Sequence, residues 1–340
     1  MTKDCIEGAD LLQWGKCLFG WWFSMRYTFA PLEGVTGYVY RNLHRRWFGG
    51  VERYYMPFIP VGQSRSFSSR EWQDICPEHN ESSDLVPQLL GKDAEGFLWA
   101  ARELRALGYR EINFNLGCPS GTVTAKGKGA GFLIRPAELE VFLDRIFSAL
   151  EEPISIKTRL GYAAPEEFPA LLELYNRYPI SELIIHPRVR QDFYRRAVRM
   201  EAFEAALPHS SNPVGYNGDL MSLSDCAAVE ARFPAVTSLM LGRGLIADPA
   251  LLRPEKRTRE RLQAFDEALY EGYRAMFGND RNAIMRMKEV WFYHIHLFEG
   301  GEKLVKRLRR TTDHAEYCAA VREIYRTLPL REHAIQGWIS

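Results

Sequence analysis

The chain has 340 residues, 46% of them hydrophobic, and its 44 lysines and arginines almost balance 43 aspartates and glutamates, for a formal net charge of +1. That length accommodates one barrel of about 250 residues plus a smaller domain, and the balanced charge excludes a global electrostatic argument for nucleic-acid binding. The six scattered cysteines include no CxxC pair, so we expect no metal site and a reducing, cytoplasmic setting, and no run approaches the roughly 20 apolar residues of a membrane span.

Residues 1–24 contain an apolar run at 11–23 and precede the first strand pattern. A secretory signal peptide carries positive charge before its apolar core, whereas three acidic residues and a single lysine precede this run. We therefore expect the functional start at Met25 and an appendage at 1–24. The alternative is an extension whose tryptophans pack on the fold.

From residue 25 to about 253, short apolar runs alternate with amphipathic stretches. Strands are predicted at 27–30, 53–57, 85–90, 111–115, 154–158, 182–186, 214–216 and 238–241. Helices are predicted between most of them, including 94–107, 136–150, 166–178 and 222–231. Strands that alternate with helices imply parallel βαβ units, and eight of them match an α/β fold of the (β/α)8 TIM-barrel type. The doubly wound alternative lacks its G-x-G-x-x-G turn after the first strand.

After Pro254 the pattern changes, because residues 255–327 are charged and helical with few strand signals. Periodicity predicts helices at about 256–277, 280–297, 301–310 and 313–327. We therefore expect a barrel domain at 25–253 and a small C-terminal helical bundle at 254–340.

The run Asn115-Leu116-Gly117-Cys118-Pro119 carries the strongest chemical signal. It follows the predicted strand at 111–115 and precedes a glycine-rich loop at 121–131. In an α/β barrel the catalytic groups lie at this end of the strands. A lone cysteine is more often a buried structural residue, but this placement favours a reactive thiol at Cys118.

Further polar residues recur where the predicted strands end. They are Gln88, Asn115, Lys157, His186, the run Asn217-Gly218-Asp219 and the run Gly242-Arg243-Gly244. Each alone has a structural explanation, such as a turn or a packed histidine, but their shared position favours a site. Loops after strands seven and eight form the usual phosphate site of this barrel, where glycines let backbone N–H groups approach an anion. A lysine at position 157 could stabilise the negative charge of a reduced flavin.

Taken together, these motifs resemble those of the tRNA-dihydrouridine synthase (Dus) family. The resemblance runs from about residue 27 to 251, and more weakly beyond, and it rests on the segments at 30–36, 86–91, 115–119, 156–159, 186–188, 217–219 and 241–244. It implies an FMN-containing barrel that uses NADPH to reduce particular uridines of tRNA to 5,6-dihydrouridine. Leu32 replaces the usual Met. Pro187 replaces the usual Gly, and because proline fixes φ and removes an N–H, it leaves the path of the Arg188 segment open to change.

The resemblance also implies roles for individual residues. FMN would contact Gln88, Lys157, His186, Asn217, Gly218, Asp219, Gly242 and Arg243, above the backbone of Pro31 and Leu32. Asn115 and Arg188 would contact the target base. The flavin would give hydride to uracil C6, while Cys118, mostly protonated at neutral pH, would protonate C5. The base must leave the stack of the folded tRNA to reach them.

A cluster of cations lies in the predicted helical domain. Residues 281–310 carry a local balance of +5, and the densest part holds Lys306, Arg307, Arg309 and Arg310. A solvated helix face is the plain explanation, but the neighbouring barrel favours contacts with tRNA phosphates. The aromatic residues at 291–293 are expected to pack between helices.

Two other functions remain open from the sequence. An FMN-barrel oxidoreductase for a free small molecule would not need the basic helical domain. A non-catalytic RNA-binding homologue would not need Cys118, Lys157 and His186 together. We expect a monomer whose macromolecular partner is tRNA.

Overall fold

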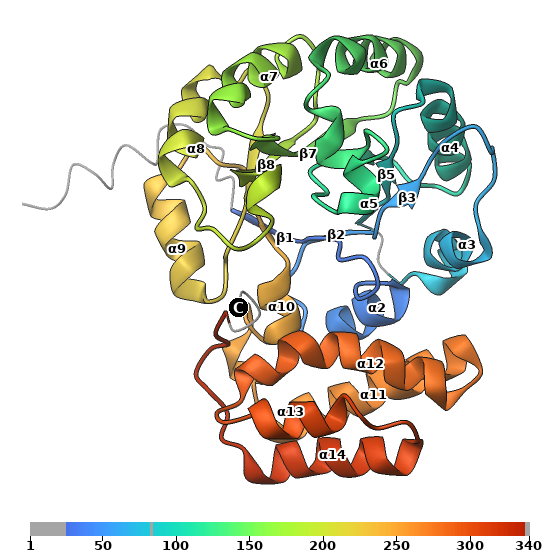
Figure 1. The fold of residues 1–340 in the computed structure, drawn as a ribbon, viewed down its shortest axis with the longest axis vertical. Coiled ribbons are helices and arrows are strands. Elements are labelled where there is room, and N and C mark those ends of the chain that lie inside the picture. The colour runs from blue at the N-terminus through green and yellow to red at the C-terminus, as the bar shows by residue number, and fades with distance from the viewer. Residues whose placement is uncertain (1–24, 82–83, 337–340) are drawn as a thin grey trace, which may run out of the picture.

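A curled parallel sheet forms the centre of the N-terminal part of the protein (Figure 1). The computed structural model describes residues 25–81 and 84–336, and the expected appendage at 1–24 lies outside these residues. The strands are β1 (Arg26–Phe29), β2 (Arg53–Tyr55), β3 (Ile59–Pro60), β4 (Leu85–Val86), β5 (Gln88–Leu90), β6 (Ile112–Leu116), β7 (Ile154–Gly161), β8 (Leu183–Val189), β9 (Val214–Asn217) and β10 (Ser238–Leu241). Each of the eight predicted strands is present, and all pair in parallel.

The sheet closes on itself through the segment 85–90. The strand order is β3-β5-β6-β7-β8-β9-β10-β1-β2-β4, so β4 and β5 stand near opposite ends of the order. Only Pro87, which has no N–H for a strand ladder, separates them in the chain. β4 pairs with β2 and β5 pairs with β6, while β3 extends the β2 segment along the same run. The predicted (β/α)8 barrel is therefore confirmed.

Helices lie between most of the strands along the chain. They are α2 (Tyr38–Trp47), α3 (Ser69–Ile75), α4 (Ala94–Ala106), α5 (Gly121–Thr124), α6 (Pro136–Ala149), α7 (Phe168–Tyr175), α8 (Met200–Ala206), α9 (Leu223–Arg232) and α10 (Arg243–Ala247). Helices such as α4, α6, α7, α8 and α9 cover the outside of the barrel (Figure 1). α4, α6, α7 and α9 match predicted helices. α2 escaped prediction because its buried face carries Arg41 and His44 beside Val39 and Tyr40, which interrupts the apolar period.

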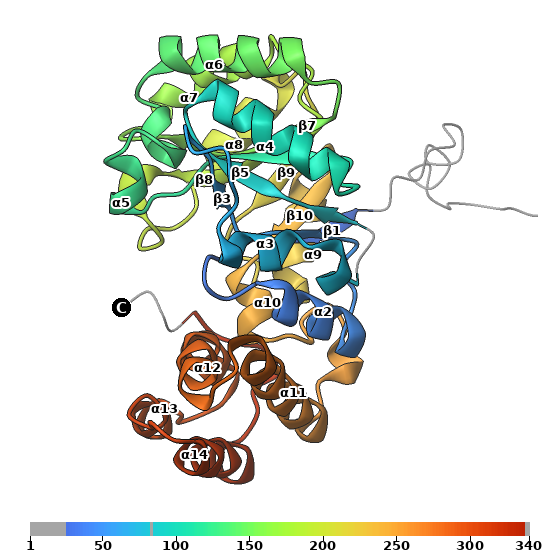
Figure 2. The same cartoon turned by 90° about the vertical axis from the view of Figure 1, so that its right-hand side faces the viewer.

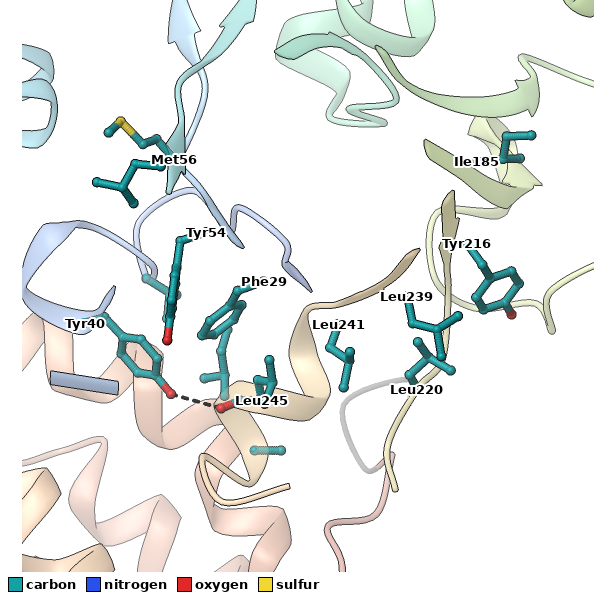
Figure 3. Packing of buried hydrophobic residues seen from close by; sticks show 14 of the residues in the cluster. Phe29, Tyr40, Tyr54, Met56, Ile185, Tyr216, Leu220, Leu239, Leu241 and Leu245 are labelled. Carbon is teal, nitrogen blue, oxygen red and sulfur yellow. Dashed lines mark hydrogen bonds between the residues drawn. The ribbon is translucent and has the colours of Figure 1, made fainter. Parts of the chain in front are cut away.

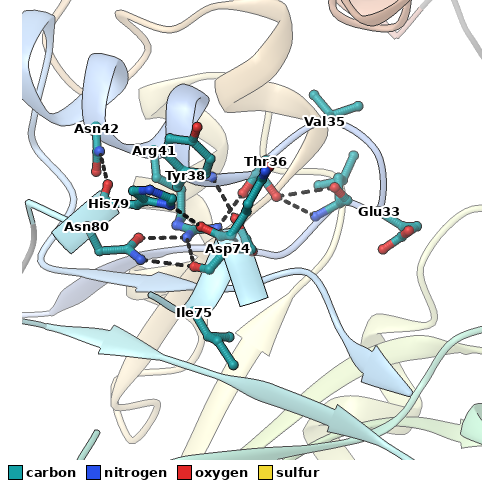
Figure 4. A network of polar contacts seen from close by, with 12 residues as sticks. Glu33, Val35, Thr36, Tyr38, Arg41, Asn42, Asp74, Ile75, His79 and Asn80 are labelled. Atoms are coloured by element: carbon teal, nitrogen blue, oxygen red, sulfur yellow. Dashed lines mark hydrogen bonds and ion pairs between the residues drawn. The ribbon is translucent and has the colours of Figure 1, made fainter. Parts of the chain in front are cut away.

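The buried guanidinium of Arg41 fixes the loop that follows β1 (Figure 4). It donates to the carbonyl of Thr36 at 2.8 Å and to Oδ1 of Asn80 at 2.8 Å, and it pairs with Asp74. The hydroxyl of Thr36 in turn accepts the backbone N–H of Leu32 at 2.7 Å. The predicted cofactor segment at Pro31 and Leu32 is thus held by side chains of α2 and its neighbours.

The C-terminal part consists of α11 (Arg259–Phe277), α12 (Asp280–His294), α13 (Glu302–Leu308) and α14 (His314–Thr327), which lie together beside the barrel (Figure 2). Side chains of Thr258, Asn279 and Asp313 cap the N-termini of α11, α12 and α14, which satisfies otherwise unpaired N–H groups. The predicted helical bundle is therefore present. In the part of the chain that the structure describes, no helix is both long and apolar enough to cross a membrane.

Barrel and helical bundle share one apolar core. Phe265 of α11 lies edge-on to Tyr40 and Phe48, with ring centroids at 5.8 and 5.1 Å. Tyr40 donates to the carbonyl of Leu245 at 3.2 Å, and its ring lies among the buried side chains of Phe29 and Tyr54 (Figure 3). Gly272 lets α11 approach α2, since a Cβ there would lie 2.7 Å from Cγ1 of Val39.

Replacement of Phe265 by alanine tests this shared core. A buried aromatic ring lost from a packed interface costs about 3–5 kcal/mol of unfolding free energy. We expect F265A to lower the stability of barrel and bundle together, in one cooperative denaturant transition seen by both circular dichroism and tryptophan fluorescence. Leu223→Ala, at a position that is 42% exposed, is the matched control and should change stability by less than about 0.5 kcal/mol. Two separate transitions would show that the parts unfold independently.

His44 joins α2 to the segment after α10 as a neutral imidazole. Its Nε2 donates to the carbonyl of Pro249 at 3.1 Å, because a carbonyl only accepts, and its Nδ1 accepts from the hydroxyl of Tyr54 at 2.9 Å. Burial lowers the pKa of His44 to about 3. The folded state therefore resists protonation that the unfolded chain accepts near its ordinary pKa of about 6.5.

This difference makes stability depend on pH. A depressed histidine pKa contributes nothing unfavourable above about pH 6.5, and the free energy of unfolding falls as the pH drops from there towards 3. We expect His44→Gln, whose amide can make both hydrogen bonds, to reduce that slope by up to about 1.4 kcal/mol per pH unit. Urea midpoints measured between pH 7.5 and 5 give the slope, and identical slopes for the two proteins would contradict the assignment.

Candidate active site

A cavity of about 250 Å³ opens at the carboxyl ends of the barrel strands. Its floor includes Ala30 and Met240, which belong to the small apolar cluster inside the barrel. Among its lining residues are nine of the predicted cofactor contacts, namely Pro31, Leu32, Lys157, His186, Asn217, Gly218, Asp219, Gly242 and Arg243. Residues from five separate loops and strands thus converge because parallel strands place their carboxyl ends at one mouth.

The side chain of Asn115 builds the turn that presents Cys118. Its Oδ1 accepts the backbone N–H groups of Gly117 and Cys118 at 3.0 and 2.9 Å, and its Nδ2 donates to Oε1 of Gln88 at 2.7 Å. Gln88 donates onward to Oδ1 of Asn113 at 2.7 Å. The amides of Gln88 and Asn115 are thus largely engaged within the protein, and they fix the path of the chain at the cysteine.

Cys118 is a partly exposed thiol on a rigid backbone. Its carbonyl accepts the N–H of Ala130 at 3.1 Å, and Gly129, at φ +56°, lies so close that a Cβ would be 3.0 Å from the Cβ of Cys118. Burial raises the pKa of the Cys118 thiol. The protonated thiol therefore dominates at neutral pH, as a proton donor requires.

Lys157 is a half-buried amine at the cavity wall. In the β6–β7 register it lies opposite Asn115. Burial and the neighbouring Arg159 guanidinium lower the pKa of Lys157 to about 7. Its Nζ makes no hydrogen bond to any residue of the described ranges 25–81 and 84–336, so the amine is available to an acceptor in the cavity. This orphaned donor fits an anionic or carbonyl-bearing cofactor.

His186 and Arg188 form one hydrogen-bonded unit with Asp219. Nη1 of Arg188 donates to Nε2 of His186 at 2.9 Å, so the imidazole carries its proton on Nδ1. Burial and the surrounding cations, Arg159 first, lower the pKa of His186 well below 6.5. Arg188, only 1% exposed, also pairs with both carboxylate oxygens of Asp219. Its guanidinium is therefore committed inside the protein.

Asp219 links two arginines across the loop after β9. Its Oδ1 accepts from Nη2 of Arg243 at 3.0 Å as well as from Arg188. The backbone of Asp219 is left-handed at φ +47°, a conformation in which aspartate is one of the more frequent residues after glycine. Asp219 thus acts on the cavity by holding Arg188 and Arg243.

The glycines of the predicted phosphate loop serve packing as well. A Cβ on Gly244 would lie 2.2 Å from the carbonyl oxygen of Leu220, whereas one on Gly242 would make only ordinary contacts at 3.4 Å. The absence of a side chain at Gly244 therefore allows α10 to pack closely against the loop after β9. Pro187, the departure noted in the sequence, lies within β8 and its carbonyl accepts the N–H of Arg199 at 2.7 Å. The β7–β8 register shifts at this point, because His186 pairs with Arg159 and Val189 with Gly161, which leaves Pro187 and Arg188 in an irregular step of the strand.

Tyr194 is a cavity residue that the sequence did not reveal. Its ring lies between two guanidiniums, with Cζ of Arg243 at 4.4 Å and Cζ of Arg159 at 5.3 Å from the ring centroid. It stands at the mouth and is 41% exposed. The available signal was an aromatic pair, Phe193-Tyr194, within the arginine-rich segment 188–199.

The helical bundle also reaches the cavity. Trp291 of α12 is buried and packs between helices as expected, but Phe292 and Tyr293 line the cavity. The four predicted tRNA-binding cations, Lys306, Arg307, Arg309 and Arg310, are exposed on and after α13. Arg307 pairs with Glu323 at 2.5 Å, and Arg309 lies over the ring of Phe292.

Comparison with known proteins agrees with this architecture. The family model described as "Dihydrouridine synthase (Dus)" matches residues 28–326. A probable tRNA-dihydrouridine synthase of Staphylococcus aureus (strain COL) is 25% identical over 310 residues, covering 87% of this chain and 92% of the relative. tRNA-dihydrouridine synthase B of Pseudomonas putida is 28% identical, covering 87% of this chain and 90% of the relative.

A solved structure shares the fold at lower similarity. Histamine dehydrogenase from Rhizobium sp. 4-9 superposes with a TM-score of 0.51 at 13% identity, covering 78% of this chain and 51% of that one. The barrel topology, the strand-end cavity and the family match over residues 28–326 together show that this chain is an enzyme of the dihydrouridine synthase (Dus) family.

Proposed function

We propose that this protein reduces specific uridines of tRNA to 5,6-dihydrouridine in the cytoplasm, with FMN as cofactor and NADPH as reductant. One observation carries the proposal: Lys157 and His186 line the cavity, and the protonated Cys118 follows a backbone that lies against Lys157, since a Cβ on Gly117 would be 3.5 Å from the Lys157 carbonyl oxygen. The family match gives that combination its reaction class.

The cavity residues fit FMN. Lys157 offers an unpartnered amine, His186 an N–H on Nδ1, and Asn217 lies on the same wall. The guanidinium of Arg243 supplies positive charge beside the loops after β9 and β10, where this barrel type binds phosphate. When bound, FMN would supply hydride to C6 of uracil, after reduction by NADPH.

Cys118 is assigned the proton that C5 of uracil receives. Its raised pKa keeps the proton on sulfur until the base accepts it. Asn115 holds the Cys118 backbone through two N–H bonds, and we assign it the further role of a contact to the base through its second amide N–H. Because uracil inside a tRNA stack cannot reach the cavity, the nucleotide must be extruded first.

Arg188 is assigned a role that differs from a simple base contact. Its side chain is buried and bound to Asp219 and His186. That arrangement makes Arg188 a positioning residue, which fixes the His186 tautomer and the loop at Asp219. The lysine and arginines near α13 are assigned to the tRNA backbone.

Replacement of Cys118 by alanine tests the proposed chemistry. Loss of a general acid lowers a rate by about 10²- to 10⁴-fold. We expect C118A to keep its flavin, which heat should release as FMN, and to keep NADPH-dependent flavin reduction, because neither step uses the thiol. Dihydrouridine in a tRNA transcript, measured by mass spectrometry under single-turnover conditions, should form at the reduced rate.

Cys76→Ala is the matched control, since Cys76 lies at the end of α3, its thiol donates to Oε2 of Glu78 at 2.7 Å, and it is not among the residues that line the cavity. It should leave the rate unchanged. Wild-type turnover by C118A would remove Cys118 from the chemistry. A parent enzyme that reduces a free pyrimidine but not tRNA would instead overturn the proposed substrate.

Joint replacement of Lys306, Arg307, Arg309 and Arg310 by alanine tests the tRNA surface. Each phosphate contact contributes about 0.7–0.9 to the slope of log affinity against log salt. Since Arg307 is paired with Glu323, we expect a loss nearer two contacts than four, with FMN content unchanged. Filter-binding titrations at several salt concentrations give the slope. Arg102→Ala with Arg110→Ala, exposed on the barrel, should leave it unaltered, and equal slopes for all variants would make the α13 cluster a solvated face.

A further inference from the structure

Phe292 and Arg309 form a stacked pair at the rim of the cavity. Phe292 of α12 lines the cavity, and Cζ of Arg309, just after α13, lies 5.2 Å from the centroid of its ring. Phe292 is half-buried and Arg309 is exposed. The pair therefore connects the barrel mouth to the basic surface of the bundle.

The pair continues a series of aromatic rings and guanidiniums that begins inside the mouth. Tyr194 lies between Arg159 and Arg243, and Phe292 meets Tyr293 edge-on with ring centroids at 5.0 Å. All three rings line the same cavity. Such alternation is the surface on which unpaired RNA bases stack, because each base has a π-face and each guanidinium is planar and cationic.

Arg309 and Arg307 differ in their ion pairs. Arg307 is neutralised by Glu323, whereas Arg309 makes no ion pair with an acidic group among the residues that the structure describes. Phe292 is only half-buried, whereas the adjacent Trp291 is fully buried between α12 and α14, where its ring meets that of Tyr325 at 5.9 Å. The Phe292–Arg309 pair is therefore free to receive a ligand that is both flat and anionic.

We propose that the Phe292–Arg309 pair is a stacking platform for the unpaired nucleotide next to the target uridine in tRNA. This inference rests on the proposed function and adds a recognition step to it. Extrusion of the uridine leaves its neighbour without a stacking partner. Phe292 would replace that partner while Arg309 holds the adjoining phosphate, so that the platform stabilises the extruded state.

The test compares variants that separate stacking from charge. Phe292→Ala should weaken tRNA binding about 5- to 150-fold, the range for loss of one base–aromatic stack, with the salt slope unchanged. Phe292→Trp should restore binding. Arg309→Lys should keep the salt slope but lose affinity, because lysine is a point charge without a stacking plane. Lys303→Ala, exposed on α13, is the control for general surface effects.

A second measurement pairs these variants with modified transcripts. In one set, the nucleotide on either side of the target uridine is replaced by an abasic residue. If the platform stacks that nucleotide, one of the two abasic transcripts should bind the parent enzyme as weakly as intact tRNA binds F292A. The same abasic transcript should bind F292A with little further loss of affinity. Additive losses at both neighbouring positions would overturn the proposal. A rise in the KM for NADPH with unchanged tRNA affinity would assign the platform to the reductant and would overturn it equally.

The proposed function and the proposed platform fail on different results. If the parent enzyme forms no dihydrouridine, the proposed function fails. If it forms dihydrouridine but F292A binds tRNA as the parent does, the platform alone fails. Flavin content and the denaturant midpoint of each variant show whether the cavity and fold are intact.

Discussion

Closure of the parallel sheet through residues 85–90 is the constraint on which the rest of the structure depends. This short run pairs with β2 before Pro87 and with β6 after it, and so completes the barrel. Only a closed parallel barrel directs every carboxyl end to one mouth. Gln88, the first residue beyond the proline, then meets Asn115 from the next strand, and Asn115 fixes Cys118. The position of the thiol thus follows from the closure.

The electrostatics of the mouth contrast with those of the whole chain. The formal net charge of the chain is only +1, but four cations, Lys157, Arg159, Arg188 and Arg243, surround His186 at the cavity, and Asp219 pairs with two of them, Arg188 and Arg243. Burial first, and then this positive charge, lowers the pKa values of Lys157 and His186. A site of that kind favours an anionic ligand, and the same field suits an RNA backbone that approaches from outside.

The helical bundle is part of the site because it shares a core with the barrel. Phe265 packs edge-on against Tyr40 of α2 and against Phe48, which directly follows α2, and these contacts set the position of α11 on the barrel. α12 packs beside α11 and also contacts α10, which directly follows the strand-end loop at Gly242. That chain of contacts brings Phe292 and Tyr293 to the cavity. The shared core therefore holds the cavity mouth and the cations near α13, both of which are proposed to contact tRNA, at a fixed separation.

The sequence by itself determined the strands and most helices, and it predicted a candidate site. Buried parallel strands read as short apolar runs, and residues at their carboxyl ends must meet once a barrel forms, so Cys118, Lys157 and His186 could be predicted together as members of one candidate site. α2 could not, because Arg41 and His44 replace apolar residues on its buried face and are satisfied by distant partners. Only the tertiary structure decided which polar groups are already engaged, as in Asn115 and Arg188, and which rings reach the mouth, as in Tyr194 and Phe292. Hydrogen bonds and ring contacts between residues far apart in the chain leave no periodic signal, since they depend on packing in three dimensions rather than on spacing along the sequence.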